Sequence, residues 1–177
     1  MKAPDLMFYV AGVAAVVIGL SAGGFVFGML VHESSHAMVC LLFGLPYSWS
    51  LTQVVYETSP EPLVNNLVGL AGGMGQTLFS LLFFWYTRVR LTKLKEKVLF
   101  RKVLNGKKSP LVSILFGFEV AFLTIAFHGI ITGIVEGLFY QIYEQTHDNL
   151  LLWGTILVLC GIVSFFILYK CQSRFLK

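Results

Sequence analysis

The chain has 177 residues and a formal net charge of +4, with 56% hydrophobic and only 12% charged residues. A soluble domain carries about a quarter charged residues to keep its surface wet. This chain carries about half of that fraction, which excludes an ordinary water-soluble domain and leaves most of the outer surface for lipid. We therefore predict an integral membrane protein whose partner is the lipid bilayer, with a positive charge that reflects topology rather than nucleic-acid binding.

Four apolar runs are long enough to cross a hydrocarbon core of about 30 Å, which needs about 20 helical residues. They occupy residues 7–43, 63–87, 111–140 and 150–169. The runs are continuously apolar and lack the period-2 alternation of lipid-facing barrel strands. The predicted fold class is therefore all-α: a polytopic transmembrane helical bundle with about four membrane-crossing segments, forming a single domain over residues 1–177.

The first run is too long for one crossing, because a helix of that length reaches about 55 Å at 1.5 Å per residue. Either the helix projects beyond the membrane, or it bends near Ser21-Ala22-Gly23-Gly24, where glycine weakens a helix. A hairpin of two short spans would be strained. Since Lys2 alone precedes the run as a basic residue, we interpret the run as a retained anchor rather than a signal peptide.

The basic residues predict the orientation of the bundle. All 13 Lys and Arg residues lie at Lys2, within 88–108, or from Lys170 onward, and the segments 44–62 and 141–149 contain none. Under the positive-inside rule, both termini and the 88–108 loop are cytosolic, and the other two loops lie outside.

Ionisable side chains inside a bilayer cost about 2.5–3.5 kcal/mol each, so each of them requires a reason. The apolar runs contain six: His32, Glu33, His36, Glu119, His128 and Glu136. No Lys or Arg lies inside the runs, so ordinary intramembrane salt bridges are not expected. Imidazoles and carboxylates without a basic partner indicate that a metal ion supplies the missing positive charge.

The spacing of these residues favours a zinc site. His32 and His36 are four residues apart on one helical face and can each offer a nitrogen to one ion. Glu33 lies beside that face, where its carboxylate can take a proton from a water molecule that the metal acidifies, as in zinc hydrolases.

A third protein ligand is needed, and the third apolar run offers three candidates without choosing among them. These are Glu119, His128 and Glu136. Beside Glu136, a glycine series predicts close approach of another helix; its members are Gly129, Gly133 and Gly137.

Three stretches of the sequence resemble the site-2 protease family of intramembrane zinc metalloproteases. The first is VHESSHA at residues 31–37, which runs on to FGLP at 43–46. The second, AGGMGQ at 71–76, is similar to the family's small-residue motif, usually Ala-Gly-Pro-Leu-x-Asn. The third, residues 128–137, repeats the spacing of Asn-x-x-Pro-x-x-x-x-Asp-Gly. The resemblance covers roughly residues 24–140, in the family's order.

The resemblance implies a role for each matching residue. His32 and His36 are zinc (Zn²⁺) ligands, and Glu33 is the general base. Glu136 stands where the family has its aspartate ligand, and both carboxylates bind zinc. Gln76 stands at the asparagine that stabilises the transition state, and its amide keeps the required donor. The implied activity is zinc-dependent hydrolysis of transmembrane segments in membrane protein substrates.

The sequence departs from the family's motifs at three further positions. Gly73 replaces a proline in the second motif, and His128 and Thr132 replace an asparagine and a proline in the third. His128 is therefore an alternative third ligand, a partner of a ligand, or a substrate contact. The charge pattern also places the site nearer the outer face, inverted relative to the family. The alternative functions are a non-catalytic zinc-binding pseudoprotease that clamps transmembrane helices and a small transporter lined by His and Glu.

Overall fold

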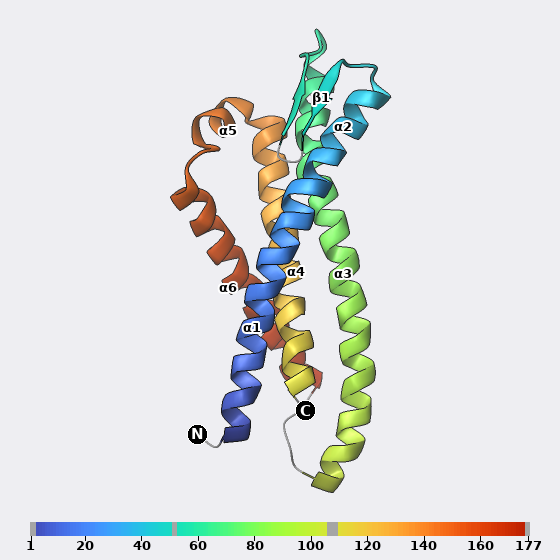
Figure 1. Ribbon diagram of the computed structural model, residues 1–177, viewed down its shortest axis with the longest axis vertical. Helices are drawn as coiled ribbons and strands as arrows, with labels where there is room; N and C mark the ends of the chain where they lie inside the picture. The colour runs from blue at the N-terminus through green and yellow to red at the C-terminus, as the bar shows by residue number, and fades with distance from the viewer. Residues whose placement is uncertain (1–2, 51–52, 106–109, 176–177) are drawn as a thin grey trace.

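The computed structural model describes residues 3–50, 53–105 and 110–175, and it is almost entirely helical (Figure 1). Its elements in chain order are α1 (Ala3–Phe25), the π-helix η1 (Val26–Val31), α2 (His32–Leu42), β1 (Tyr47–Trp49), β2 (Val54–Tyr56), α3 (Pro62–Asn105), α4 (Pro110–Leu138), α5 (Tyr140–Thr146) and α6 (Leu150–Phe175). Four stretches of helix are long and apolar enough to cross a membrane: Leu6–Leu42, Pro62–Leu94, Pro110–Leu138 and Leu150–Cys171. The all-α, polytopic prediction is confirmed.

The first run forms one continuous helical rod from α1 through η1 to α2 rather than a hairpin (Figure 1). Residues 21–24, where a bend was one of the two expectations, are α-helical. The glycines of α1 serve close packing instead: a Cβ added at Gly19 would lie 2.6 Å from the Cβ of Ala121, and one at Gly23 would lie 2.6 Å from Ile125 Cδ1. The helical pattern changes only at η1, and such π-turns inside α-helices frequently mark functional sites.

Helices α3 and α4 pack against each other through glycines on both sides. A Cβ added at Gly73 would overlap the backbone of Gly129 and Gly133, and one added at Gly69 would lie 2.6 Å from the carbonyl oxygen of Glu136. Without side chains between them, the two backbones come close enough to carry interhelical contacts directly. This packing fixes the rotation of α4 and thereby decides which of its polar residues faces α2.

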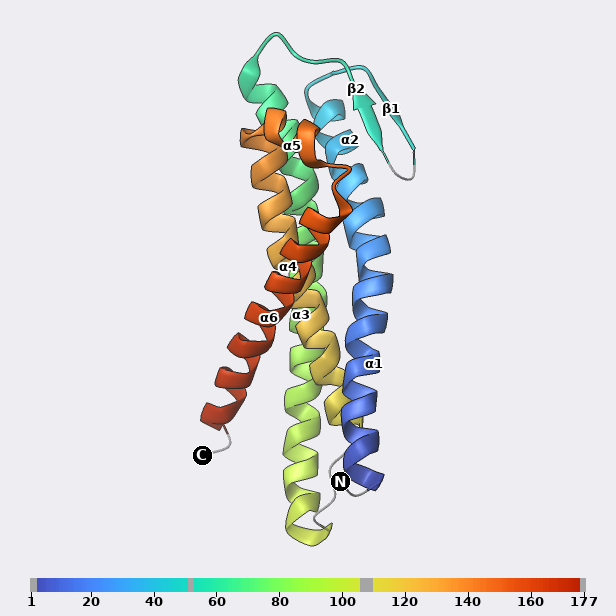
Figure 2. The same ribbon diagram turned by 90° about the vertical axis from the view of Figure 1, so that its left-hand side faces the viewer.

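A β-hairpin and the short helix α5 cover the end of the bundle where α2 ends (Figure 2). Gly44 has φ of +66°, the left-handed conformation that commonly ends a helix, and the amide of Leu45 donates back to Cys40 O at 2.9 Å. The chain then turns into β1, which pairs antiparallel with β2 so that Trp49 lies opposite Val54. The sequence analysis predicted no strand here.

The opposite end of the bundle carries the start of α1, the end of α3, the start of α4 and the end of α6 (Figure 1). This arrangement agrees with an even number of crossings. The predicted 88–108 loop is wrong over most of its length, because α3 continues as a helix to Asn105, and residues 106–108 lie outside the described part of the chain. The cytosolic location of both termini stays a prediction.

The expectation that no basic residue reaches the buried acids is wrong for Glu119. Its side chain is fully buried, and its Oε2 lies 3.1 Å from Arg88 Nη1. The second apolar span extends to Leu94 and therefore includes Arg88, which the sequence analysis had placed just outside the run. Glu119 is explained by this ion pair and is no longer a candidate metal ligand.

Candidate metal centre

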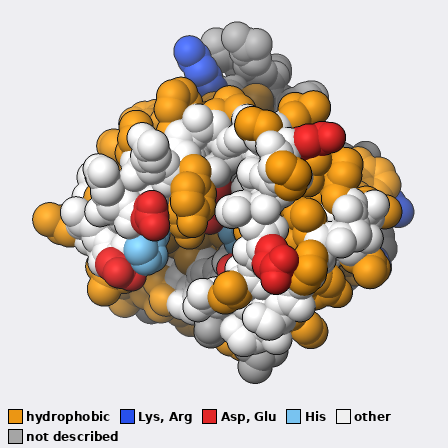
Figure 3. Space-filling view, turned by 90° about the horizontal axis from the view of Figure 1, so that it is seen from above, with side chains coloured by type: hydrophobic (Ala, Val, Ile, Leu, Met, Phe, Trp, Pro, Cys, Tyr) orange, Lys and Arg blue, Asp and Glu red, His pale blue; other side chains and the backbone are white. Residues whose placement is uncertain are grey.

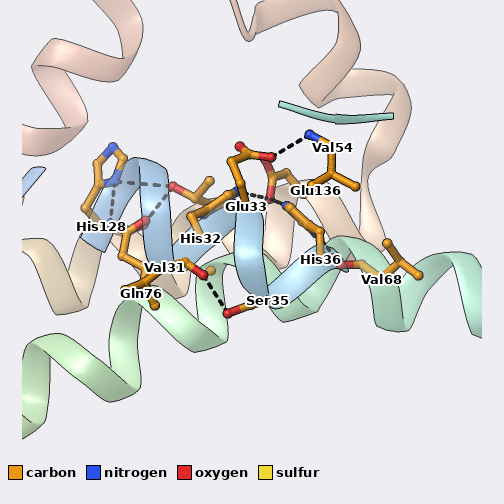
Figure 4. Close-up of polar contacts among 12 residues, drawn as sticks. Val31, His32, Glu33, Ser35, His36, Val54, Val68, Gln76, His128 and Glu136 are labelled. Atoms are coloured by element: carbon orange, nitrogen blue, oxygen red, sulfur yellow. Dashed lines mark hydrogen bonds and ion pairs between the residues drawn. The ribbon is translucent and has the colours of Figure 1, made fainter. Parts of the chain in front are cut away.

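Three side chains from two helices converge on one point (Figure 4). His32 and His36 lie one turn apart on α2, and Glu136 comes from α4. Glu136 Oε2 is 3.1 Å from His32 Nε2 and 3.6 Å from His36 Nε2. One ligand atom from each residue lies within 4.8 Å of the others, and this buried group could hold a metal ion.

The two imidazoles pack directly against the backbone of α3 at Gly72. A Cβ added there would fall on His36 Nε2 and lie 2.6 Å from His32 Nε2. One turn further on, a Cβ added at Gly75 would fall on Ser35 Oγ, on the neighbouring face of α2. The small residues of the second motif therefore let α2 approach α3 closely enough for both histidine rings to lie over the α3 backbone.

The protonation of His36 can be inferred from its hydrogen bond. Its Nδ1 lies 2.6 Å from the carbonyl oxygen of Val68, which can only accept, so Nδ1 carries the proton and Nε2 presents a lone pair. Nε2 thus faces the Glu136 carboxylate at 3.6 Å, and in the neutral ring it presents its lone pair there, as a metal ligand would. A carbonyl that orients a ligating histidine in this way is the usual support for a metal site.

The two distances from Glu136 to the histidines fit a tetrahedral metal ion. Metal–ligand bonds of about 2.0–2.1 Å at tetrahedral angles place the ligand atoms about 3.3 Å apart. The contacts of Glu136 Oε2 with the two histidines, 3.1 and 3.6 Å, bracket this value. Within the described part of the chain, Glu136 Oε2 is buried and has no hydrogen-bond partner, and neither has His32 Nδ1. Two nitrogens and one oxygen form a donor set that zinc accepts, with a fourth position left open.

Glu33 lies beside this group rather than in it. Its Oε2 accepts a hydrogen bond of 2.8 Å from the backbone amide of Val54 in β2, and Figure 4 shows its carboxylate beside Glu136. The hairpin thereby fixes one carboxylate oxygen and leaves Oε1 for chemistry. The sequence analysis placed Glu33 next to the ligand face, but it missed the contribution of Val54.

The structure places Gln76 beside His128, and both line the same cavity as His32 and Glu136. Gln76 Nε2 lies 3.1 Å from the carbonyl oxygen of Ile125 and 3.4 Å from His128 Nδ1. His128 Nδ1 also lies 3.3 Å from Thr132 Oγ1, whose hydroxyl donates to the His128 carbonyl oxygen at 2.9 Å. The two candidates for the third ligand are therefore separated: Glu136 faces the histidines of α2, and His128 faces Gln76.

Two cavities meet at the site. One, of about 320 Å³, extends from His32 and Glu33 past His128 to Trp153 on α6. The other, of about 380 Å³, leads from His36 and Glu33 past the hairpin and α5. Seen from the hairpin end, acidic and histidine side chains gather around a hollow in this face (Figure 3). The site is therefore reachable both from between the helices and from the end of the bundle.

Tyr143 on α5 lines both cavities, and the sequence analysis missed it. Burial raises the pKa of its phenol, and the charge of Glu136 and a hydrogen bond with that carboxylate raise it further. The phenol therefore stays protonated and available as a donor at neutral pH. Nothing in the sequence indicates this role, because Tyr143 follows the third apolar run without a motif around it.

The fold and the site define a helical membrane protein with a buried His–His–Glu group that could hold a metal ion. No protein-family model, curated protein or solved structure matches the chain. The resemblance to site-2 proteases therefore depends on the three motifs and on the positions of their residues.

Proposed function

We propose that the protein is a zinc-dependent intramembrane endopeptidase that hydrolyses transmembrane segments of membrane proteins. The observation that carries the proposal is the convergence of His32, His36 and Glu136 within 4.8 Å, at a buried point between spans, with Glu33 at its edge. A purely structural metal site has no use for a carboxylate held beside it. This favours a hydrolase over a pseudoprotease that clamps helices.

A zinc ion held by His32, His36 and Glu136 would supply an acidified water molecule and polarise a substrate carbonyl. Glu33 takes the proton of the attacking water at Oε1, because Oε2 is engaged by the Val54 amide. It then returns the proton to the leaving amine nitrogen as the peptide bond breaks. Val54 acts as a positioning residue, since its amide limits the rotation of the Glu33 carboxylate.

The apolar residues that line the first cavity suit an apolar substrate. Leu20, Gly24 and Gly28 on the first span line it, together with Leu157 on α6, and a Cβ added at either glycine would meet open space. A transmembrane segment that enters between these helices must unwind before its backbone reaches the site, since helical hydrogen bonds shield its carbonyls. Polar groups at this depth are tolerated because they line a cavity.

The test is a paired measurement on Glu33→Gln, with Glu57→Gln as the matched control at an exposed position. Proteins purified in detergent are assayed for zinc and then, in proteoliposomes, for cleavage of a panel of tagged single-pass transmembrane segments. We expect Glu33→Gln to keep wild-type zinc and to lose about 10²–10⁴-fold in cleavage rate, the usual contribution of a general base. Wild-type-like cleavage by Glu33→Gln, or no cleavage by any zinc-loaded wild-type preparation, would overturn the proposal.

A further inference from the structure

Tyr143 is a residue of the candidate metal centre that the proposed chemistry does not use. It lies on α5, outside the candidate membrane spans, and its side chain lines both cavities at the site. Its hydroxyl forms a hydrogen bond with the carboxylate of Glu136. An ionised carboxylate can only accept, so the phenol is the donor and contacts Glu136 from the side of α5.

The other members of the site are each oriented by the backbone. The carbonyl oxygen of Val68 lies 2.6 Å from His36 Nδ1, and the amide of Val54 donates to Glu33 Oε2 at 2.8 Å. Glu136 reaches the histidines on a side chain with several rotatable bonds, and a ligating carboxylate is usually held by a hydrogen bond of its own. The hydroxyl of Tyr143 supplies that bond.

The Glu136 carboxylate can serve a metal ion and the phenol at the same time. Its two oxygens offer about four acceptor sites. Oε2 lies 3.1 Å from His32 Nε2 and 3.6 Å from His36 Nε2, and it has no hydrogen-bond partner within the described residues. An ion bound at Oε2 therefore leaves acceptor sites for the hydroxyl, and the hydrogen bond need not break when the site is filled.

Aromatic neighbours hold the ring of Tyr143 independently of its hydroxyl. The ring meets Trp153 of α6 edge to face, with centroids 6.1 Å apart, and lies against the ring of His147 at 5.8 Å. Trp153 Nε1 donates to the carbonyl oxygen of Thr146 at 2.9 Å, which joins α6 to α5. These contacts involve rings and backbone, so a phenylalanine at position 143 would keep them and lose only the O–H donor.

We propose that Tyr143 is a positioning residue of the candidate metal centre, whose hydroxyl holds the Glu136 carboxylate in the orientation that turns Oε2 toward His32 and His36. The inference deepens the proposed function and rests on its zinc site, but not on peptide cleavage. A carboxylate that is already oriented loses less rotational freedom when an ion binds, so the hydroxyl raises the affinity for zinc. Part of the support of the metal centre thereby comes from a helix outside the spans.

The first test measures metal affinity and needs no turnover. Each protein, purified in detergent, is titrated with zinc against graded chelator. We expect Tyr143→Phe to bind zinc about 10- to 100-fold more weakly than wild type, the usual effect of losing the partner of a metal ligand. The matched control is Tyr169→Phe, which removes the same hydroxyl from an exposed tyrosine of α6 and should bind zinc like wild type.

The second test replaces Zn²⁺ by Co²⁺, whose visible absorption reports the geometry of its ligands. At saturating cobalt, the bands of Tyr143→Phe should be shifted, whereas those of Tyr169→Phe should superimpose on wild type. A tyrosine that merely stabilised α5 would leave the saturated spectrum unchanged.

These outcomes separate the inference from the proposed function. If wild type binds zinc, an unchanged affinity or an unchanged cobalt spectrum in Tyr143→Phe would overturn the inference alone, and so would an equal loss of affinity in Tyr169→Phe. Zinc binding without any cleavage would refute the peptidase and leave the role of Tyr143 standing. If wild type binds no zinc, the metal centre fails and takes both proposals with it.

Discussion

Gly72 gives the most direct test of the metal group, because one added methyl group would collide with two ligands at once. The Cβ of an alanine at this position would fall on His36 Nε2 and lie 2.6 Å from His32 Nε2. Ordinary contact begins at 3.4 Å, so the His32 nitrogen would have to retreat by about 0.8 Å. Metal sites hold their ligand distances to about 0.2 Å, which is several times smaller than this displacement.

We therefore expect Gly72→Ala to weaken zinc binding by about 10- to 100-fold, the range found when the supports of metal ligands are removed. Alanine is favoured over glycine in a helix by about 1 kcal/mol, so α3 itself gains stability, and a loss of zinc cannot be attributed to a weaker helix. The matched control is Gly154→Ala, since a Cβ at Gly154 meets open space.

The assay measures zinc by mass spectrometry after equilibration of each purified protein against graded chelator. Helical content, measured by circular dichroism, confirms that the variant is folded. Wild type and Gly154→Ala should lose zinc at the same chelator concentration, and Gly72→Ala should lose it at a lower one. Coincident curves for all three proteins would show that the histidine nitrogens do not bind metal over Gly72.

Two further predictions concern the ligands and the topology. His36→Ala should reduce zinc content from about one per chain to near zero, because one lost imidazole removes several kcal/mol of metal affinity; full occupancy measured by mass spectrometry would contradict the ligand assignment. Single cysteines introduced into residues 141–149 should react with an impermeant reagent on intact cells, because the basic residues stay on the cytosolic side. Those at 95–108, beyond the end of the second span, should not react. The reverse pattern would invert the orientation.

The spans and the histidine pair could be predicted because both depend on local properties of the sequence. Hydrophobic length alone indicates a crossing, and the cost of burying His32, Glu33 and His36 together gave a reason to expect a metal before the fold was known. Neither property depends on how the helices are rotated about their axes. The third candidate ligand does depend on that rotation, so neither property could identify it.

The choice between Glu136 and His128 depends on packing between helices. These residues lie two turns apart on α4, and the sequence gives each of them a reason to face inward. The close contact of Gly69 and Gly73 with the α4 backbone sets the rotation that brings Glu136 to the histidines and His128 to Gln76. A glycine series predicts close approach, but it does not give the register of that approach.

The sequence does contain a pattern typical of the first strand of the β-hairpin, although the overall composition obscures it. Residues 47–52 read Tyr-Ser-Trp-Ser-Leu-Thr, an alternation of apolar and small polar side chains that is typical of a strand. The segment is short and lies between two strongly apolar runs, and it was interpreted only as part of a loop without Lys or Arg. Its contact with the site, the Val54 amide on Glu33, depends on tertiary packing and has no counterpart in the sequence pattern.

The error over Glu119 has a different physical cause, and it leads to a test. A basic residue at the end of an apolar run was taken to mark the membrane boundary, but a long Arg side chain can reach along its helix to a buried partner. Arg88 does so, and its Nη1 lies 3.1 Å from the fully buried Glu119 Oε2. The pair joins α3 to α4 at a distance from the metal group, since Glu119 lies 17 residues before Glu136 on α4.

Removing one partner of this pair should be worse than removing both. Arg88→Met leaves the Glu119 carboxylate buried without its cation, and we expect a loss of about 3–5 kcal/mol in the free energy of unfolding. Adding Glu119→Met to that variant replaces the pair by apolar side chains and should recover most of the loss, because no uncompensated charge remains. Denaturant unfolding in detergent micelles measures both variants against wild type. If the double variant were as unstable as Arg88→Met, the loss in the free energy of unfolding would come from lost packing of the arginine side chain. The unpaired charge of Glu119 would then not be its cause.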